Sequence, residues 1–439
     1  MPSLKIILVS LTKKMWPKVS AYALFGVASA LAALVFKEHI SDKLSDVVDR
    51  ETVSSILTIL ASSMLAVTTF SLSTMVSAYS AATANVTPRA TPLITEDKTT
   101  QNALSTFLGT FLFSLVGIIA LNMGAYEGSG RFILFIVTLA VIVLIVVTLI
   151  RWIERLTSLG RVSETSRLVE VAAAKAMKNR ARKPTFGCRK LDALPDNLKP
   201  GGELAAESSG YVQFLDARAL SKLAGQYETD VYVTAMPGKY VTRGTRLALT
   251  AISLTAESRK AFLKCFTLAD QRTFEQDPRY GLCVLMEIAS RAASDAMHDN
   301  GTAIDVIARL DRVLEVYAQG RDKTGDTELS RVWIPELRID DLFNDAFGPL
   351  IRNAAKVFEV QLRLQKALVH LGSLDNDYLE SARKFSRMAL KHSEAGIFLE
   401  EDQAELRGIA QRLYTMAGEH FDEAGKINLS DSSPGAVSK

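Results

Sequence analysis

Four long runs without a charged residue dominate the first 150 residues of the chain. Three of them, Val19–Phe36, Ala103–Met123 and Phe132–Ile150, contain 18, 21 and 19 residues, close to the ~20 residues with which a helix spans a bilayer. The fourth run, from Thr52 to Pro88, has no charge over 37 residues, so its helix extends past the hydrocarbon into water. This pattern predicts a four-helix transmembrane domain over residues 1–150.

After the last run the pattern becomes that of a water-soluble chain. We expect a basic connecting helix over residues 151–186, unbroken to about Lys183, and a small β module over 187–256, where short β-like runs alternate with turns. Amphipathic patterns predict a helical domain over 257–424, and the polar residues 425–439 are predicted to be a disordered tail. The predicted fold class is an α-helical membrane protein with four transmembrane helices, followed by a cytoplasmic α+β region.

Two details of the helical domain follow from local signals. The apolar spacing predicts one long helix from Ile339 to Leu371. Another helix begins after the turn at Asn300-Gly301, where Thr302 and Asp305 form a candidate capping box. In such a box the threonine side chain accepts a hydrogen bond from the backbone three residues later, so we expect Thr302 to be the N-cap.

Charge separates the two halves of the chain more sharply than the average composition does. Residues 1–150 carry 10 Lys/Arg and 8 Asp/Glu, whereas the other 289 residues carry 41 and 40. Such a distribution excludes a purely soluble enzyme and a disordered protein. The formal net charge of +3 is too small to indicate nucleic-acid binding by the whole chain.

The basic residues near the spans predict the topology. Four lysines and no acid lie before the first run, and Arg151, Arg155 and Arg161 follow the last. Because cytoplasmic loops of membrane proteins are enriched in Lys and Arg, both termini are expected to be cytoplasmic. Trp16 and Trp152 are expected at the membrane surface on that side, where amphipathic indole rings are common.

The second span carries a stripe of hydroxyl side chains. At 100° per residue, six of its Ser and Thr residues fall close to one line along the helix: Ser55, Ser62, Thr69, Ser73, Ser77 and Ser80. Hydroxyl groups line water-filled pores, and they also let helices approach closely and hydrogen-bond across the contact. The stripe therefore predicts either a pore lining or a packing seam.

The segment after the second span and the composition of the spans bear on this choice. Arg89 and Lys98 follow the span and are candidates for the cytoplasmic mouth of a pore; the alternative is a helix stop at Pro88 with an interfacial anchor. The spans contain no Asp, Glu or His at mid-membrane, which disfavours ion-coupled active transport. Small residues four apart, such as Gly26 and Ala30, predict close helix packing and a homo-oligomer.

Glycine turns mark the β module. Pro237-Gly238, Val241, Gly244 and Leu247 form a P-G-x-x-V-x-x-G-x-x-L pattern that resembles the turns of biotinyl- and lipoyl-type barrel-sandwich modules. Lys239 does not lie in the hairpin that such carriers modify, so no prosthetic group or other cofactor is expected. The three cysteines, at positions 188, 265 and 283, lack metal-site spacing and are expected to be reduced, buried thiols.

The search for catalytic chemistry finds little. Asp295, His298 and Asp299 have a spacing that places three ligands on one helix face, but no second His or Cys cluster accompanies them, so no metal site is predicted. The charged run from Asp270 to Arg279 contains no nucleophile and no phosphate loop. The chain is expected not to be an enzyme.

Several motifs together resemble one family. The Pro88-Arg89 loop after a Ser/Thr-rich span, Gly210-Tyr-Val-Gln before the glycine turns, Gln276-Asp-Pro-Arg-Tyr-Gly281, and Asp299-Asn-Gly-Thr-Ala303 are similar to the bacterial predicted-membrane-protein family known as domain of unknown function 2254. The likeness runs through nearly the whole chain, although His298-Asp299-Asn300 stands where the family usually has Asn-Asp-Pro. The resemblance implies the fold and a bacterial inner-membrane location, and it supplies no activity.

Two functions remain open from the sequence. The first is an oligomeric channel-like protein, in which the second span lines a passive pathway for a small ion or solute and the cytoplasmic region forms a vestibule or gate. The second is a non-conducting sensor or scaffold, anchored in the membrane, whose cytoplasmic region binds a ligand or protein partner. Membrane lipid and further copies of the chain are the expected partners in both cases, and no nucleic acid is expected.

Overall fold

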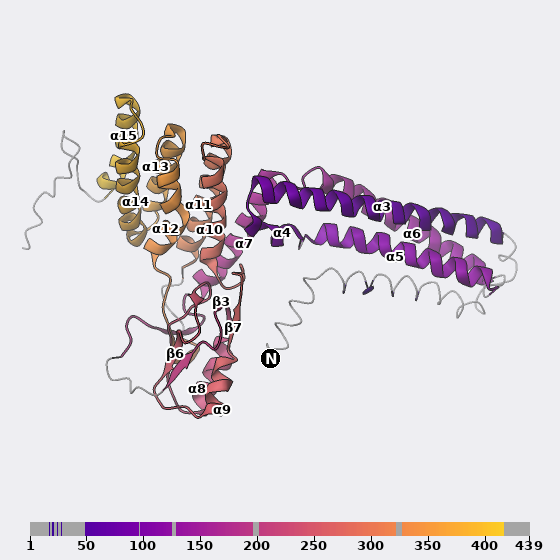
Figure 1. Ribbon diagram of the computed structural model, residues 1–439, viewed down its shortest axis with the longest axis horizontal. Coiled ribbons are helices and arrows are strands. Elements are labelled where there is room, and N and C mark those ends of the chain that lie inside the picture. The colour runs from indigo at the N-terminus through magenta and orange to yellow at the C-terminus, as the bar shows by residue number, and fades with distance from the viewer. Residues whose placement is uncertain are drawn as a thin grey trace, which may run out of the picture. The chain divides into compact units, whose positions relative to one another are not determined.

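The computed structural model describes residues 49–416 except 96, 125–128, 196–201 and 322–326, together with positions 17, 20, 21, 24 and 28. Most of the described residues are helical (Figure 1). The described chain divides into an N-terminal unit, which ends at Thr165, and a C-terminal unit, which begins at Ser166. Almost all of the first predicted span lies outside the described residues, and so does the whole predicted tail.

Three long helices form the N-terminal unit. Its elements are α3 (Arg50–Asn85), η3 (Pro88–Ala90), α4 (Thr91–Thr95), α5 (Lys98–Asn122) and α6 (Ser129–Leu156), followed by the first turn of α7 (Val162–Arg182). Among the described residues, three helices are long and apolar enough to cross a membrane: Arg50–Ala84, Lys98–Asn122 and Gly130–Leu156. They correspond to the second, third and fourth predicted spans.

Helix α3 is longer than a bilayer requires. Its 36 residues extend over roughly 54 Å at 1.5 Å per residue, against a hydrocarbon thickness of about 30 Å. The helix ends at Asn85, three residues before Pro88, as expected because proline lacks the N–H that the helix needs. Thr87 then caps the short η3 helix by accepting a hydrogen bond from the N–H of Arg89 at 3.3 Å.

Helix α5 is the most buried of the three long helices. Many of its buried residues are small or carry a hydroxyl group: Thr100, Ser105, Thr106, Gly109, Thr110, Ser114 and Gly117. A side chain at Gly117 would begin 3.1 Å from a methyl group of Leu57 on α3, so the two backbones approach closely. Larger apolar residues of α3, α5 and α6, such as Leu57, Phe113 and Leu134, fill the space between the helices.

The prediction of an unbroken helix from Ile150 to about Lys183 is wrong. Helix α6 ends at Leu156, and α7 begins at Val162. In the turn between them Gly160 has φ +77°, a conformation that glycine adopts readily, and a Cβ at this position would lie 3.2 Å from the carbonyl oxygen of Ala78 on α3. The glycine therefore lets the turn pack directly against the backbone of α3.

Two sheets lie in the C-terminal unit. Their strands are β1 (Cys188–Lys190), β2 (Glu203–Ala205), β3 (Gly210–Leu215), β4 (Val231–Val233), β5 (Tyr240–Val241), β6 (Arg246–Thr250), β7 (Phe266–Ala269) and β8 (Leu329–Ile334), with α8 (Ala217–Gln226) and α9 (Ala256–Leu263) between strands. One sheet has the order β1-β8-β4-β6-β2 and the other β5-β3-β7. Strand β8 pairs in parallel with β1 and β4, whereas the other pairs are antiparallel. Strands β7 and β8 come from beyond residue 256, where the predicted module ends.

The predicted glycine turns flank β5. Gly238 and Gly244 have φ values of +96° and +86°, which glycine adopts without steric cost. A side chain at Gly238 would collide with the carboxylate of Asp277, whose nearest oxygen lies 2.4 Å from the position of a Cβ. Asp277 also pairs with Arg272 at 2.7 Å and caps α10 through the N–H of Tyr280. The turn is thus packed against the start of α10.

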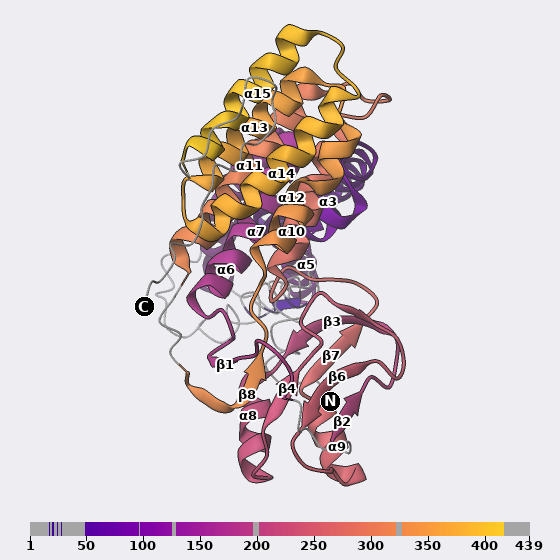
Figure 2. The same ribbon diagram turned by 90° about the vertical axis from the view of Figure 1, so that its left-hand side faces the viewer.

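The remaining helices form one layered group in the C-terminal unit. They are α10 (Pro278–Ala292), α11 (Asn300–Gly320), α12 (Ile339–Asn353), α13 (Phe358–Gly372), α14 (Asn376–Glu394) and α15 (Glu400–Thr415). Helices α10, α12 and α14 pack in this order in one layer, and α11, α13 and α15 pack in the same order in a second layer against it (Figure 2).

The prediction of a single helix from Ile339 to Leu371 is wrong, because this segment forms two helices, α12 and α13. The break is stabilised by a side chain of α13. The buried amide of Gln361 donates a hydrogen bond to the carbonyl oxygen of Ala354 at 3.0 Å, and that carbonyl follows the end of α12. This satisfies a polar group that would otherwise be buried without a partner.

Candidate functional site

The six predicted pathway residues lie together on one side of α3, which we call the hydroxyl face. All six are exposed in the single chain: Ser55, Ser62, Thr69, Ser73, Ser77 and Ser80. The opposite side of α3 carries the buried residues, among which Leu57 and Met64 pack against α5 and α6. The hydroxyl face therefore points away from the two helices that pack on α3 in the described part of this unit.

Hydrogen bonds along α3 satisfy some of these hydroxyl groups. Ser62 donates to the carbonyl oxygen of Thr58 at 3.0 Å, and Thr69 donates to that of Leu65 at 2.8 Å. Hydroxyl groups bonded in this way to the preceding turn can face an apolar surrounding, because the donor has a partner. Their oxygens can still accept a hydrogen bond from water or from a neighbouring helix.

Large apolar residues flank the hydroxyl face. Ile59, Phe70 and Val76 are 63%, 65% and 57% exposed, and they lie to either side of the stripe at helical spacing. A side of the helix with a polar centre and apolar flanks matches contact with lipid or with another helix at the flanks. Only the narrow centre is suited to contact with water.

The predicted mouth residues lie in the segment between α3 and α5. Arg89 belongs to η3, Lys98 is the first residue of α5, and the side chains of both are exposed. Both residues follow shortly after α3 in the chain, beyond the end of the helix that carries Ser80.

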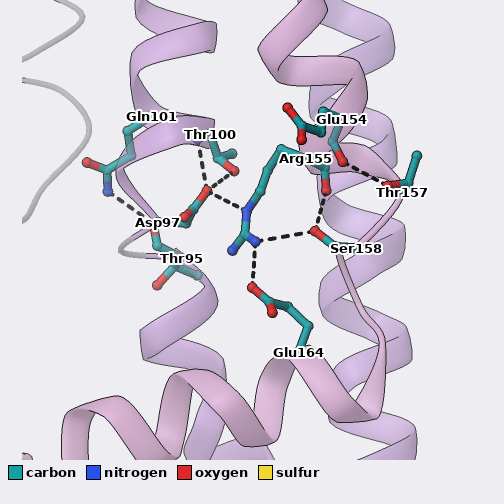
Figure 3. A network of polar contacts seen from close by, with 9 residues as sticks. All are labelled: Thr95, Asp97, Thr100, Gln101, Glu154, Arg155, Thr157, Ser158 and Glu164. Atoms are coloured by element: carbon teal, nitrogen blue, oxygen red, sulfur yellow. Dashed lines mark hydrogen bonds and ion pairs between the residues drawn. The ribbon is translucent and has the colours of Figure 1, made fainter.

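A cluster of charges near the same segment was not predicted. Arg155, near the end of α6, lies between two carboxylates (Figure 3): its Nε is 3.2 Å from Asp97, and its Nη1 is 2.5 Å from Glu164. The side chains of all three are only 13% to 16% exposed. We call these three residues the Arg155 cluster.

Further hydrogen bonds hold the Arg155 cluster in place. Asp97 caps α5 by accepting from the N–H and the hydroxyl of Thr100 at 3.0 and 2.7 Å, and Ser158 accepts from Arg155 at 3.3 Å. Glu164 lies in the first turn of α7, where a negative charge is favourable. The cluster thus joins the start of α5, the end of α6 and the start of α7, and α7 continues from there into the C-terminal unit.

The sequence signals for this cluster were partial. Arg155 was interpreted only as a basic flank of the last span, and Asp97 has the position of an N-cap before α5. Their pairing joins residues 58 apart in the chain, which no local pattern reveals. Glu164 belongs to the segment that was predicted to continue the last helix. It joins the cluster at the start of a separate helix, α7, because α6 ends at Leu156.

Trp152, which is predicted to lie at the membrane surface, is packed between the helices of the N-terminal unit. It is 1% exposed, and its indole N–H donates a hydrogen bond to the hydroxyl of Ser71 at 2.9 Å. Ser71 is fully buried on the side of α3 opposite the hydroxyl face. The bond satisfies the polar atom of a large buried ring and fixes α6 against α3.

The three residues weighed as metal ligands do not converge. The carboxylate of Asp295 lies 2.8 Å from the Lys356 amine, and that of Asp299 accepts hydrogen bonds from the N–H and hydroxyl of Thr302. Hydrogen bonds from Thr302 hold the pKa of Asp299 below its usual range. The N-cap of α11 is therefore Asp299 and not Thr302 as predicted. The Asp299 carboxylate accepts the hydrogen bond of the free N–H of Thr302 in the first turn of the helix.

The three cysteines are free thiols. Cys188 and Cys265 are buried, and Cys283 is partly buried. Burial raises the pKa of Cys188 and Cys265 to about 12 and that of Cys283 to about 11. Since the thiolate is the reactive form, all three are expected to react slowly at neutral pH.

The fold places the chain among helical membrane proteins with a mixed C-terminal region. Residues 12–370 match the model of the family described as predicted membrane protein (DUF2254). The chain belongs to this family.

Relatives with curated sequences share less of the chain. Uncharacterized proteins of Mycobacterium bovis and Mycobacterium tuberculosis are each 26% identical to it over 255 residues, which cover 54% of this chain and 48% of the relative. The chain thus matches about half the length of these relatives. No solved structure matches it.

Proposed function

We propose that this chain forms a channel-like homo-oligomer in the bacterial inner membrane, in which the hydroxyl faces of several copies line a passive pathway for a small ion or solute. One observation carries the proposal: all six hydroxyl residues are exposed on the side of α3 that α5 and α6 leave open. Assembly around this side would bring the hydroxyl faces together at its centre. The proposal assigns the chain no enzymatic reaction and no cofactor.

The charge distribution supports a passive pathway. Residues 52–88, 99–126 and 132–150 contain no charged residue, so these segments offer no side chain that binds and releases a proton at mid-membrane. The charged residues of these helices lie near the helix ends. Among them are Asp97 and Arg155 of the Arg155 cluster, whose third member, Glu164, belongs to α7. In the proposal both termini are cytoplasmic, as the basic residues around the spans favour, and the C-terminal unit serves as gate or vestibule.

A second candidate is a non-conducting membrane-anchored sensor or scaffold. The back-bonded hydroxyl groups of Ser62 and Thr69 favour it, because they need no water to satisfy their donors. In this case the hydroxyl face would be a dry seam against another helix, and the C-terminal unit would bind a ligand or a protein partner. The two candidates differ in whether water reaches the hydroxyl face of the assembled protein.

Cysteine accessibility distinguishes the candidates. Single cysteines at Ser62, Thr69, Ser73 and Ser77 are expected to react with a small hydrophilic thiol reagent in native membranes, because the pathway holds water. Cysteines at Leu60 and Val67, on the packed side of the same helix, serve as matched controls and should stay protected. The unmodified chain should show almost no labelling, since burial raises the pKa of its three thiols.

Conductance completes the test. The purified protein in planar bilayers is expected to pass current, and the labelled Ser73→Cys variant is expected to pass less. Protection of all six positions, together with no current from the unmodified protein, would refute the pathway and support the scaffold. Disulfide cross-linking of Ser73→Cys between copies reports whether the hydroxyl faces meet. A cross-link within one copy to a second cysteine introduced between residues 19 and 36 would contradict the proposed assembly.

A further inference from the structure

A pocket lies within the C-terminal unit, between the ends of three helices. Its volume is about 550 Å³, and its walls come from the last turns of α10, α12 and α14 and from the short segments that follow them. These helices pack side by side in the order α10, α12, α14 (Figure 2). A volume of this size lies within the range of about 300–1,000 Å³ that is typical of small-molecule sites.

Three polar side chains in this pocket have no partner. Within the described part of the chain, Arg352, Asn353 and His392 make no side-chain hydrogen bond or ion pair, and all three line the pocket. Elsewhere in this unit, arginines with carboxylates in reach pair with them, as Arg279 does with Asp345 at 2.5 Å. Donors from two different helices therefore remain available to one ligand.

The charge of the lining favours an anion. Arg352 and Lys356 contribute two positive charges, and Asp295, which pairs with Lys356 at 2.8 Å, contributes one negative charge. Asn353 adds amide donors, and His392 adds a ring N–H. Guanidinium and amide donors around one small volume match the oxygens of a phosphate group, which accepts several hydrogen bonds at once.

Close backbone packing fixes one wall of the pocket. A Cβ at Gly396 would lie 3.0 Å from the Cα of Lys356 and 3.1 Å from the carbonyl oxygen of Ala355. The segment after α14 therefore packs closely on the segment after α12, and a larger residue at position 396 would press on that backbone. The small side chains of Ala355 and Ala395 line the same region, so the space next to the donors stays open.

We propose that this pocket binds a phosphate monoester, with Arg352 and His392 as its principal donors. The pocket is larger than a phosphate ion, so the organic part of the ligand also lies inside it. The phosphate group belongs to a soluble metabolite or to the headgroup of phosphatidic acid, because both present the same oxygens. The proposal does not depend on conduction through the membrane, so the two can fail separately.

Inorganic phosphate is the first probe. Line broadening in phosphorus NMR is measured for the purified full-length protein in neutral detergent, at constant ionic strength set with chloride. Arg352→Gln and His392→Gln are each expected to weaken phosphate binding roughly tenfold, the loss that removal of one charge-assisted hydrogen bond typically causes. Arg387→Gln is the matched control, because Arg387 lies exposed on α14 and outside the pocket.

A variant that fills the pocket separates binding from folding. Ala395 is exposed at the rim, so Ala395→Trp is expected to keep the melting temperature of the protein and to abolish phosphate binding. Equal loss of binding in Arg387→Gln and Arg352→Gln would overturn the proposal, and so would unchanged binding in both Arg352→Gln and Ala395→Trp.

Neutral-lipid nanodiscs with and without phosphatidic acid identify the source of the phosphate group. Slower hydrogen exchange at residues 352–356 and 392–397 in the presence of phosphatidic acid, reversed by Arg352→Gln, would support the lipid headgroup. Protection by inorganic phosphate alone would support a soluble ligand. If neither probe protects these residues, the pocket is not a phosphate site.

Discussion

The two units of the molecule differ in which residues they bury and which they expose. In the N-terminal unit the central helix α5 buries small and hydroxyl-bearing residues, such as Thr106, Gly109 and Ser114, whereas α6 exposes large aliphatic residues such as Val143 and Ile150. In the C-terminal unit the helices bury leucine and aromatic residues and expose their charges. A water-soluble helix sorts its residues by hydrophobicity, but a helix in lipid gains little from burying an aliphatic side chain.

The placement of ion pairs differs in the same way. In the N-terminal unit, Arg155 pairs with Asp97 and Glu164 at the end of the bundle. In the C-terminal unit ion pairs join many elements, as Glu170 of α7 does with Arg309 and Arg312 of α11. The side chains of the Arg155 cluster are only 13% to 16% exposed, so its loss should have a larger effect than the loss of a more exposed pair such as Asp340 with Lys384.

The largest expected effect comes from Arg155→Gln. It leaves the carboxylates of Asp97 and Glu164 close together and only 13% and 16% exposed, without the charge that offsets them. Removing one partner of a buried ion pair costs about 3–5 kcal/mol, and for these partly exposed groups we expect roughly 2–4 kcal/mol. Hydrogen exchange of the full-length protein should show faster opening at residues 97–104 and 157–165.

Arg151→Gln is the control for this experiment. Arg151 lies one turn earlier on α6 and is exposed, so the same change of residue should alter exchange by less than about 0.5 kcal/mol. If Arg151→Gln and Arg155→Gln have equal effects, the cluster does not hold the three helices together. The comparison of the two units would then lose its main support.

A smaller effect is expected inside the membrane-spanning part, from Ser71→Ala. This change removes the acceptor of the Trp152 indole N–H, which is buried on the packed side of α3. A buried donor left without a partner costs about 1–3 kcal/mol, and hydrogen exchange in α3 and α6 should increase accordingly. Ser73→Ala, two residues away on the exposed hydroxyl face, should leave exchange almost unchanged, and equal effects of the two would contradict the assignment of faces.

The sequence predicted those parts of the fold that depend on local signals. Three spans followed from the length of uncharged runs, and Pro88 marked the end of α3 because proline cannot continue a helix. Gly238 and Gly244 were recognised as turn residues because their spacing fits a reversal of the strand, and both have positive φ.

Contacts between segments that are distant in the chain could not be predicted from such local signals. Strand β8 pairs with β1 and β4, from segments about a hundred or more residues earlier, and the choice of partner depends on the whole core. The same holds for the candidate site. The periodicity of α3 placed six hydroxyl residues on one side, but only the packing of Leu57 and Met64 on α5 and α6 shows that this side is open.

The smallest effect tests the surface charges of the C-terminal unit. Asp340, at the start of α12, accepts hydrogen bonds from Lys384 and Ser381 of α14, each at 2.6 Å. The bond from Lys384 is the main cause that holds the pKa of Asp340 below its usual value of about 3.9. A carboxylate with a lowered pKa in the folded state stabilises the protein above its unfolded pKa, and this contribution is lost as the pH falls through the folded value.

Asp340→Asn should therefore lower the stability of the helical part by less than about 1 kcal/mol at pH 7, because the pair is partly exposed and screened by solvent. Below about pH 4 the difference from the unmodified protein should shrink, because the native carboxyl group is then protonated too. Melting temperatures at both pH values measure this, with Glu380→Gln on the exposed side of α14 as control. A difference that stays the same on acidification would mean that Asp340 acts through its hydrogen bond with Ser381 rather than through its charge, and its ion pair with Lys384 would then contribute nothing measurable to stability.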